Sequence, residues 1–363
     1  MELSLESEAA LLRDSVRRFM SREYGFEARQ QRRAQPDGFC RRTWASMADL
    51  GFVSAALPPA AGGFGFGALG ALIIAEACGG ALVVEPWLAT GVLGAGALDL
   101  AGSSVQRELL PAVSEGRCLL AFAEGHLAIT GDWRLGGEAH AVLHAAAADW
   151  FVVAARIDAG PAATPAALLL VPAASPGLRL HRYTTPDGLP AADLDCDGVQ
   201  LGPEALLGTP EAGPALLERL HDRASAALCA EAVGAMDALL SRTITYLGTR
   251  QQFGVALGQF QALRHRVADM AMELEQARSM ALVAALHADD EDAASRRRHV
   301  SAARACIARA ARQVGQQALQ LHGGIGMTDA LDVSHYFRRL TMIALAGGDE
   351  GAHLDRYLEA SGR

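Results

Sequence analysis

The spacing of apolar residues changes twice along this chain of 363 residues, and the order of those changes limits the folds open to it. In the first third, apolar residues such as Leu12, Val16 and Phe19 recur every three or four positions, as in amphipathic helices. From about Cys118 the apolar residues form short runs separated by Gly, Pro and Asp, which is typical of strands. After Gly208 the helical spacing returns. The sequence therefore predicts an α+β protein in the order helices, sheet, helices.

These changes divide the chain into a helical domain over residues 1–115, a middle β-domain over 116–213 and a C-terminal four-helix bundle over 214–363. In the first domain we expect a helix over 69–81 and a further helical stretch that ends near Leu110-Pro111. Strands are expected at the apolar runs 119–122, 150–154 and 168–171. The core positions of the bundle are predicted to be Val233, Met236, Leu240, Ile244 and Leu247 in one helix, Leu263, Val267, Met270, Leu274, Ala277 and Ala281 in a second, and Ile307, Ala310, Val314, Ala318 and Leu321 in a third.

Composition excludes several classes of chemistry. All 32 basic residues counted as Lys+Arg are arginines, so chemistry that needs a lysine amine is excluded. A net charge of −9 argues against nucleic acid as a partner.

The six cysteines contain no C-x-x-C pair, which favours buried free thiols in a reducing compartment and predicts no metal site. The N-terminus lacks the pattern of a signal peptide, and no apolar run reaches membrane-spanning length, so we expect a cytoplasmic protein without a membrane partner.

The segment Thr249–Gly254 combines a guanidinium, an amide and an aromatic ring at the predicted end of a long helix, with Gly254 as the expected helix stop. The Arg250 guanidinium can bind a phosphate through two N–H donors, and the Gln252 amide can hydrogen-bond to a second phosphate oxygen. Phe253 offers a flat face on which a nucleobase can stack. The alternative is a solvated arginine and a core phenylalanine at a helix end.

A second segment, Gln320–Thr328, carries paired glycines at the end of the third bundle helix. Gly323 and Gly324 allow a ligand to approach the main chain closely, and backbone N–H groups there can bind an anion. The alternative is an ordinary glycine cap that needs no ligand.

Taken together, R-x-Q-F-G at Arg250 and Q-x-x-G-G at Gln320 resemble the C-terminal domain of the acyl-CoA dehydrogenases. Weaker similarities extend along the chain, at the turn 58–65, at Glu76, at Leu110-Pro111 and at Leu206–Gly208. Within the family, the segments 227–236, 259–263 and 339–343 resemble the small subunit of pimeloyl-CoA dehydrogenase. The chain also resembles the degenerate subunit of paired dehydrogenases that act on steroid side chains.

This resemblance implies an FAD enzyme that oxidises an acyl-CoA to a trans-2-enoyl-CoA and passes electrons to an electron-transferring flavoprotein. A carboxylate base takes the α-proton while hydride leaves for the flavin. In the family, the two motifs hold the adenine and pyrophosphate end of a flavin whose ring lies on the neighbouring subunit. On this chain those positions are Arg250, Gln252, Phe253, Gln320, Gly323 and Gly324.

Both positions at which the family places its base lack a carboxylate here. One corresponds to Gly347 and the other, on the helix before R-x-Q-F-G, to Ala224. Asp349 and Glu350 follow Gly347 closely, and either could act only if the loop brought its carboxylate to the α-carbon. The alternative is that both are acids of a solvated loop.

The middle domain is also expected to be shortened, because the family segment that bonds the flavin ring is reduced here to residues 122–126. The leading hypothesis is therefore a supporting, non-catalytic subunit that pairs with a second acyl-CoA dehydrogenase subunit, as in an α2β2 assembly. Two alternatives remain open. One is a self-sufficient homo-oligomer that uses Asp349 or Glu350, and the other is a non-catalytic acyl-CoA-binding or scaffolding relative.

Overall fold

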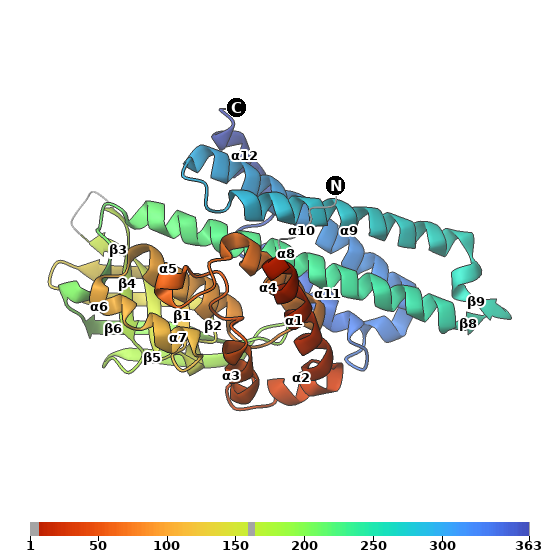
Figure 1. Ribbon diagram of the computed structural model, residues 1–363, viewed down its shortest axis with the longest axis horizontal. Coiled ribbons are helices and arrows are strands. Elements are labelled where there is room, and N and C mark those ends of the chain that lie inside the picture. The colour runs from red at the N-terminus through yellow and green to blue at the C-terminus, as the bar shows by residue number, and fades with distance from the viewer. Residues whose placement is uncertain (1–6, 159–163, 363) are drawn as a thin grey trace. The chain divides into compact units, whose positions relative to one another are not determined.

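The computed structural model describes residues 7–158 and 164–362 and divides into two compact units. The helical unit comprises Met1–Arg29, Ala68–Val83 and Ser225–Arg363, and the sheet unit comprises Gln30–Gly67 and Val84–Ala224. The α+β class and the order of helices, strands and helices are as predicted (Figure 1).

Long helices build the helical unit, because their apolar residues recur at the spacing of one helix face. They are α1 (Ser7–Glu23), α4 (Gly67–Ala81), α8 (Gly213–Thr249), α9 (Gln261–His287), α10 (Ala293–His322), α11 (Val333–Leu345) and α12 (Glu350–Ala360), of which α8 belongs to this unit from Ser225 onward. All five core positions predicted for α10 are buried, and so are Met270, Leu274, Ala277 and Ala281 of α9. In α8, Ile244 is exposed, so that predicted core position is wrong.

Two glycines bring the backbones of α4 and α8 into direct contact. A Cβ atom added to Gly79 would lie 1.8 Å from the carbonyl oxygen of Glu231, and one added to Gly234 would lie 1.8 Å from that of Glu76. Beside this crossing, the Glu231 carboxylate accepts two hydrogen bonds from Arg339 of α11, from Nε at 2.6 Å and from Nη2 at 2.8 Å. Both side chains are buried, so close packing joins α8 to α4 and a buried ion pair joins α8 to α11.

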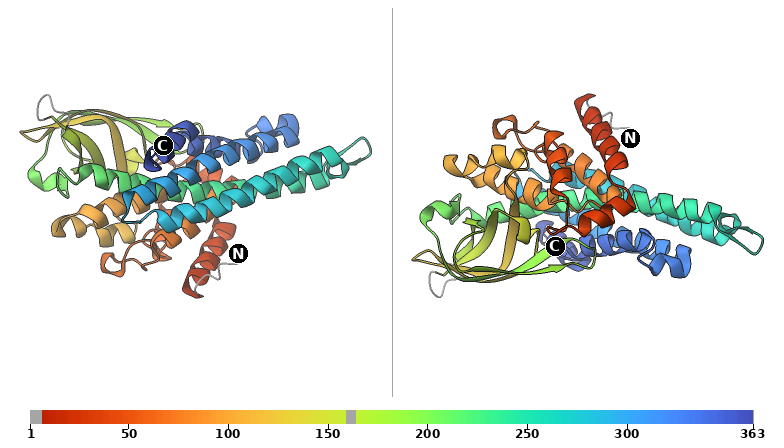
Figure 2. Two further views of the ribbon diagram at one scale, coloured as in Figure 1. Left: turned by 90° about the horizontal axis from the view of Figure 1, so that it is seen from above. Right: turned by 90° about the horizontal axis from the view of Figure 1, so that it is seen from below.

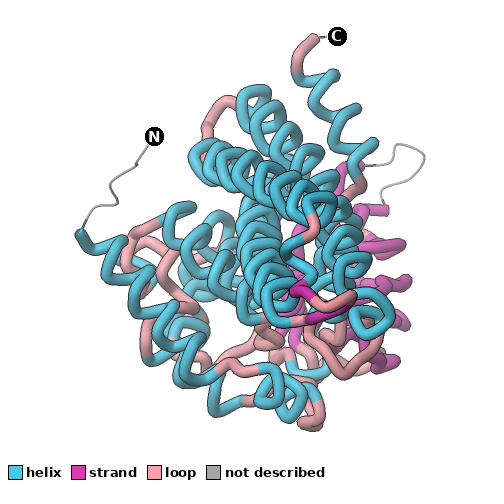
Figure 3. Tube along the Cα trace, turned by 90° about the vertical axis from the view of Figure 1, so that its right-hand side faces the viewer, coloured by secondary structure: helices cyan, strands magenta, loops and turns pink. Residues whose placement is uncertain are grey.

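A seven-stranded sheet forms the centre of the sheet unit, in the order β5-β6-β2-β1-β3-β4-β7. Figure 3 shows its strands side by side in magenta. Neighbouring strands are antiparallel except β1 and β3, which are parallel. The strands are β1 (Leu120–Thr130), β2 (Arg134–Leu143), β3 (Trp150–Asp158), β4 (Thr164–Pro172), β5 (Leu178–Thr184), β6 (Pro190–Gln200) and β7 (Leu206–Leu207).

The continuous apolar runs of the sequence belong to strands that are buried on both faces. Phe151 and Val153 of β3 pack in one apolar cluster, whereas Val152 packs in a second with Leu98 and Val113 of short helices. Because alternate residues of a strand point to opposite faces, a strand covered on both sides has no polar alternation. The three predicted strands are therefore confirmed as parts of β1, β3 and β4.

The remaining elements are short. They are α2 (Phe26–Arg33), α3 (Arg41–Asp49), the π-helix η2 (Trp87–Gly94), α5 (Ala95–Ala101), α6 (Ser104–Arg107), α7 (Leu110–Ser114), the 3-10 turns η1 (Pro59–Ala61), η3 (Ala145–Ala147), η4 (Pro203–Ala205), η5 (Leu257–Gln259) and η6 (Gly323–Met327), and a hairpin of β8 (Gln251–Gln252) and β9 (Val255–Ala256). The expected helix end at Leu110-Pro111 is wrong. Pro111 instead lies in the first turn of α7, where its missing N–H costs no hydrogen bond.

All six cysteines are free thiols, as expected, although Cys40 and Cys306 are only half-buried. Among the described residues, one helix, α8, is long and apolar enough to satisfy a length and composition test for membrane spans. Its apolar window is 83% buried within the fold, and core helices pass the same test.

Candidate functional site

The two motifs predicted to hold a dinucleotide meet at one end of the helical unit. The ring of Tyr246, one turn before Arg250, stacks on His322 with 4.4 Å between ring centroids. The Tyr246 hydroxyl also donates to the His322 carbonyl oxygen at 3.3 Å. His322 lies between Gln320 and Gly323, so the ends of α8 and α10 are joined. In both views of Figure 2 the hairpin after α8 lies at the tip of the long helices.

The first motif forms the hairpin β8–β9. Helix α8 ends at Thr249 rather than at Gly254, which instead turns the hairpin with a φ of +80°. The Leu257 N–H donates to the Arg250 carbonyl oxygen at 2.9 Å and closes the base of the hairpin. Within residues 7–158 and 164–362, no side chain pairs with the exposed Arg250 guanidinium. All its donors are therefore open to a ligand.

An aromatic ring is exposed to solvent at the tip of this hairpin. Phe253 is 89% exposed and has a φ of +55°, which is uncommon for a residue with a Cβ atom. It meets Phe260 edge to face, with 6.1 Å between ring centroids. The prediction that Phe253 is available to a planar group is consistent with this exposure, and the core alternative is wrong. Gln252 is exposed too, with its amide donating to the carbonyl oxygen of Gln251 at 2.9 Å.

The second motif ends α10 with open space in front of its backbone. Gly323 has a φ of +66°, and its N–H donates to the carbonyls of Gln320 and Leu319. A Cβ atom added to Gly323 or Gly324 would meet no described atom within 4 Å. The amide of Gln320 is exposed at the same helix end. A phosphate can therefore reach the main chain here without displacing a side chain.

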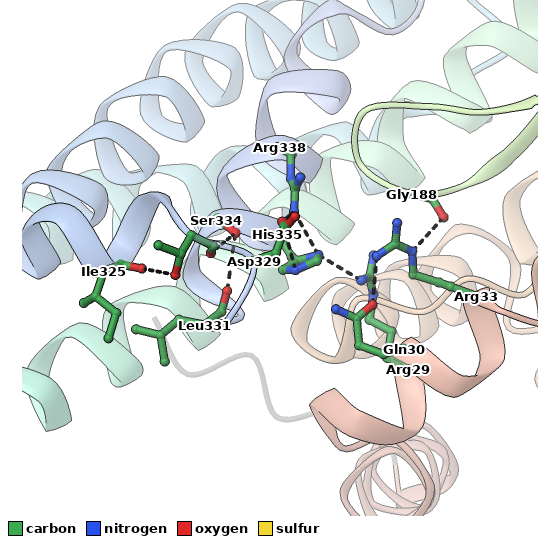
Figure 4. Close-up of polar contacts among 11 residues, drawn as sticks. Arg29, Gln30, Arg33, Gly188, Ile325, Asp329, Leu331, Ser334, His335 and Arg338 are labelled. Atoms are coloured by element: carbon green, nitrogen blue, oxygen red, sulfur yellow. Dashed lines mark hydrogen bonds and ion pairs between the residues drawn. The ribbon is translucent and has the colours of Figure 1, made fainter.

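Hydrogen bonds fix the turn that follows the glycines. Figure 4 shows Ser334 beside the carbonyl of Leu331, to which its hydroxyl donates at 3.3 Å. The Arg338 guanidinium donates to Asp329 at 2.6 Å in the same figure. The Thr328 hydroxyl donates to the carbonyl of Ile325 at 2.8 Å. The turn is thus held by its own contacts and does not need a ligand to form.

His322 has a structural role in this site. Its Nδ1 lies 2.9 Å from the carbonyl oxygen of Ala318, and burial lowers its pKa. The ring is therefore neutral at pH 7. The site then offers one cation, two amides, an exposed aromatic ring and open glycine backbone, a donor set that suits the phosphates and base of a dinucleotide such as FAD.

The positions expected for a catalytic base hold none. Gly347 has a φ of +69° and is exposed, and Ala224 is buried. Asp349 caps α12, where its carboxylate accepts from the N–H of Ala352 at 2.9 Å. Glu350 accepts from Arg312 at 2.7 Å. Asp349 thus serves as a helix cap and Glu350 as an ion-pair partner, so each acid has a structural role that does not require it to be a catalytic base.

An ionisable pair in the sheet unit was not found from the sequence. Nε2 of His221 on α8 lies 2.8 Å from a carboxylate oxygen of Glu124 on β1, and this hydrogen bond lowers the pKa of Glu124. Phe122 meets the His221 ring edge to face at 6.0 Å. Glu124 and Phe122 belong to the segment that the family resemblance associates with the flavin ring. The sequence carries no local signal for the pairing, because the partners are 97 positions apart.

Comparison with known proteins gives a consistent result. Residues 6–117 match the family described as acyl-CoA dehydrogenase, N-terminal domain, and residues 215–361 match acyl-CoA dehydrogenase, C-terminal domain. Acyl-CoA dehydrogenase FadE27 of Mycobacterium tuberculosis is 30% identical over 85% of this chain and 85% of its own length.

Two solved structures share the fold over nearly the whole chain. A variant of the Tcur3481-Tcur3483 steroid ACAD is 28% identical, with a TM-score of 0.88 and 98% of each chain covered. The ChsE4-ChsE5 complex from Mycobacterium tuberculosis is 26% identical, with a TM-score of 0.89, and 100% of this chain and 99% of that chain are covered.

Proposed function

This chain belongs to the acyl-CoA dehydrogenase family, and on that premise we propose that it is the supporting subunit of a heteromeric, FAD-dependent acyl-CoA dehydrogenase. Its part is to hold the adenine and pyrophosphate end of a flavin whose ring lies on a second, catalytic subunit. Two observations carry this proposal together: the motifs at the ends of α8 and α10 are exposed, and the two base positions hold Gly347 and Ala224 instead of a carboxylate.

The residues at this end fit a dinucleotide. The open Arg250 guanidinium can take a phosphate with two hydrogen bonds, and the glycine turn at Gly323 and Gly324 presents backbone to a second phosphate. Phe253 can stack on the adenine, while Gln252 and Gln320 supply amide hydrogen bonds. FAD, when bound, supplies the hydride acceptor of the reaction. This chain binds and orients its nucleotide end.

The exposed apolar residues at this end support a neighbouring subunit. Phe253, Ile325 and Met327 are 89%, 47% and 77% exposed, and they lie on the two segments that carry the motifs. Large apolar side chains left in water are typical of a surface that another protein covers. Covering these side chains would also exclude water from a phosphate bound at Arg250, which strengthens a charge-assisted hydrogen bond.

The proposal also covers the partner subunit, the substrate, the electron acceptor and the location of the assembly. The Tcur3481-Tcur3483 and ChsE4-ChsE5 relatives are named as pairs of chains, which supports a second acyl-CoA dehydrogenase subunit as the partner. The steroid ACAD among them supports a bulky acyl-CoA as substrate, and the likeness to a pimeloyl-CoA dehydrogenase small subunit remains a prediction. We further propose an electron-transferring flavoprotein as acceptor and a cytoplasmic location.

The first test measures flavin in the chain purified alone and co-expressed with a candidate partner subunit. We expect flavin only in the mixed assembly, at about one per pair of chains, and one flavin per chain purified alone would contradict the proposal. In the mixed assembly, Arg250→Ala removes a charge-assisted bond and should weaken flavin binding on the order of 10- to 100-fold. The matched control is Arg42→Ala, an exposed arginine of α3. Equal flavin affinity in both variants would exclude Arg250 from the site.

A second test addresses the self-sufficient alternative. Asparagine caps helices as well as aspartate does, so Asp349→Asn keeps the cap of α12 while removing the carboxylate. We expect unchanged turnover of acyl-CoA in the mixed assembly. A folded Asp349→Asn assembly without turnover would favour Asp349 as the base and a catalytic role for this chain.

A further inference from the structure

A group of potential metal ligands lies at the connection between α9 and α10, in the helical unit. His287 is the last residue of α9, Asp290 follows it in the connection, and His299 lies in the second turn of α10. One ligand atom can be chosen from each side chain so that all three atoms lie within 4.8 Å of one another. In a tetrahedral zinc site, ligand atoms at about 2 Å from the ion are roughly 3.4 Å apart. Small side-chain rotations would therefore bring these three atoms to coordination distance.

The two imidazole rings are already arranged side by side. Their centroids are 3.6 Å apart and their planes differ by 13°. Ligand atoms from both rings and from Asp290 lie within 4.8 Å of one another, so both rings can contribute to one site. Neutral imidazole is the form that binds transition metals.

Hydrogen bonds orient both rings, and that of His299 does so as in known metal sites. Nδ1 of His299 lies 2.8 Å from the carbonyl oxygen of Ser295, a contact that leaves Nε2 with a free lone pair when Nδ1 carries the proton. Nδ1 of His287 lies 2.7 Å from Oδ2 of Asp290, and the Ser295 hydroxyl donates to the same oxygen at 2.9 Å. Metal-binding histidines commonly donate their other ring nitrogen to a carbonyl or carboxylate. The contact of His299 with Ser295 matches that pattern, whereas Asp290 is placed beside His287 as a ligand and would exchange its hydrogen bond for the ion.

Charge and access at this connection also favour a cation. Asp290 lies within the acidic run 289–292, and Oδ2 of its carboxylate lies 2.7 Å from Nδ1 of His287 and 2.9 Å from the Ser295 hydroxyl. Arg296 donates to the main-chain carbonyl oxygen of Asp290 at 2.9 Å. The side chains of His287 and Asp290 are 33% and 30% exposed, so an ion can reach them from solvent.

We propose that His287, Asp290 and His299 bind a divalent transition-metal ion of the zinc class. Two imidazoles and one carboxylate are the ligands that Zn²⁺ and Co²⁺ accept, and the fourth position is left to water. Because the ligands come from the end of α9, the connection and the start of α10, the ion holds these two helices together. The sequence predicts no metal site, because its cysteines lack metal-binding spacing and these histidines form no known motif.

The test is a Co²⁺ titration of the tag-free protein after removal of metal with a chelator. We expect visible absorption bands of bound Co²⁺ that saturate at about one ion per chain and that Zn²⁺ abolishes. His299→Ala should weaken Co²⁺ binding on the order of 100-fold, because it removes one of three protein ligands. The control is His265→Ala, an exposed histidine of α9 outside the proposed site, which should bind Co²⁺ as the wild type does.

A second variant keeps the test decisive if His299→Ala does not fold. Asp290→Asn keeps the shape of the side chain and removes its charge, and it should also weaken Co²⁺ binding, with the helical circular dichroism unchanged. Zn²⁺ should raise the melting temperature of the wild type and of His265→Ala, but not that of Asp290→Asn. Absence of Co²⁺ binding by the wild type, or binding equal in wild type, His299→Ala and Asp290→Asn, would overturn the proposal.

Discussion

Replacing Gly234 by alanine should separate two helices that now touch through their backbones. In the structure, an added Cβ atom at this position would lie 1.8 Å from the carbonyl oxygen of Glu76 and 2.9 Å from the backbone nitrogen of Gly80. Both neighbours are main-chain atoms of α4, so neither can rotate away as a side chain would. The perturbation therefore acts on the position of the whole helix.

The size of the effect follows from this distance. Real Cβ atoms essentially never come closer than 3.0 Å to such an atom, so α4 has to withdraw by more than about 1 Å along this contact. Overpacking of a core by a single group costs about 1–3 kcal/mol when side chains can adjust. Because Ile74 and Ala75 of α4 are fully buried and would lose contacts as well, we expect a loss at or above the upper end of that range.

The assay is urea unfolding followed by circular dichroism at 222 nm, at one fixed protein concentration. Gly248→Ala is the matched control, because it lies on the same helix α8 and its added Cβ atom would meet no described atom within 4 Å. Alanine is the better helix former, so this control should be more stable than the wild type by about 0.5–1 kcal/mol. A Gly234→Ala protein as stable as the Gly248→Ala control would refute the close approach of α4 and α8.

Two further predictions concern buried charge. Arg339→Met and Glu231→Met should each lower the free energy of unfolding by about 3–5 kcal/mol, because each leaves one buried charge unpaired, whereas the double variant should lose far less than the sum. Additive losses in urea unfolding would show that the pair is not coupled. Burial raises the pKa of Glu85 from 4.5 to about 8, even with Arg32 at 3.8 Å, so the folded chain retains a proton that the unfolded chain releases. This proton stabilises the folded chain fully below about pH 4.5, and the stabilisation is lost as the pH rises through about 8. The free energy of unfolding should therefore decline between about pH 5 and 9, and Glu85→Gln should make that decline smaller. An unchanged pH profile in Glu85→Gln would show that Glu85 does not cause the decline.

Periodicity and motif spacing predicted what depends on neighbouring residues in the chain. The helix expected over 69–81 is α4 over Gly67–Ala81, and the apolar positions of α10 lie in the core as expected. The motifs at Arg250 and Gln320 were identified because each is a contiguous segment with a recognisable pattern. Their meeting at one end of the bundle depends on the contact of Tyr246 with His322, which the sequence alone does not encode locally.

What the sequence did not predict depends on partners far apart in the chain. Glu124 and His221 are 97 positions apart, and Glu231 and Arg339 are 108 positions apart.

The end of α8 was misplaced for a different reason. A glycine is equally suited to a helix cap and to a hairpin turn, and here Gly254 serves the hairpin while α8 stops at Thr249.

The open guanidinium of Arg250 and the open glycine turn have a thermodynamic consequence for the proposed assembly. The turn is held by its own hydrogen bonds, so the surface that receives the nucleotide is preformed before any ligand arrives. If a second subunit completes that surface, flavin affinity and subunit affinity are linked and must change by the same factor. Dilution that separates the subunits then releases flavin, and flavin in excess holds the subunits together.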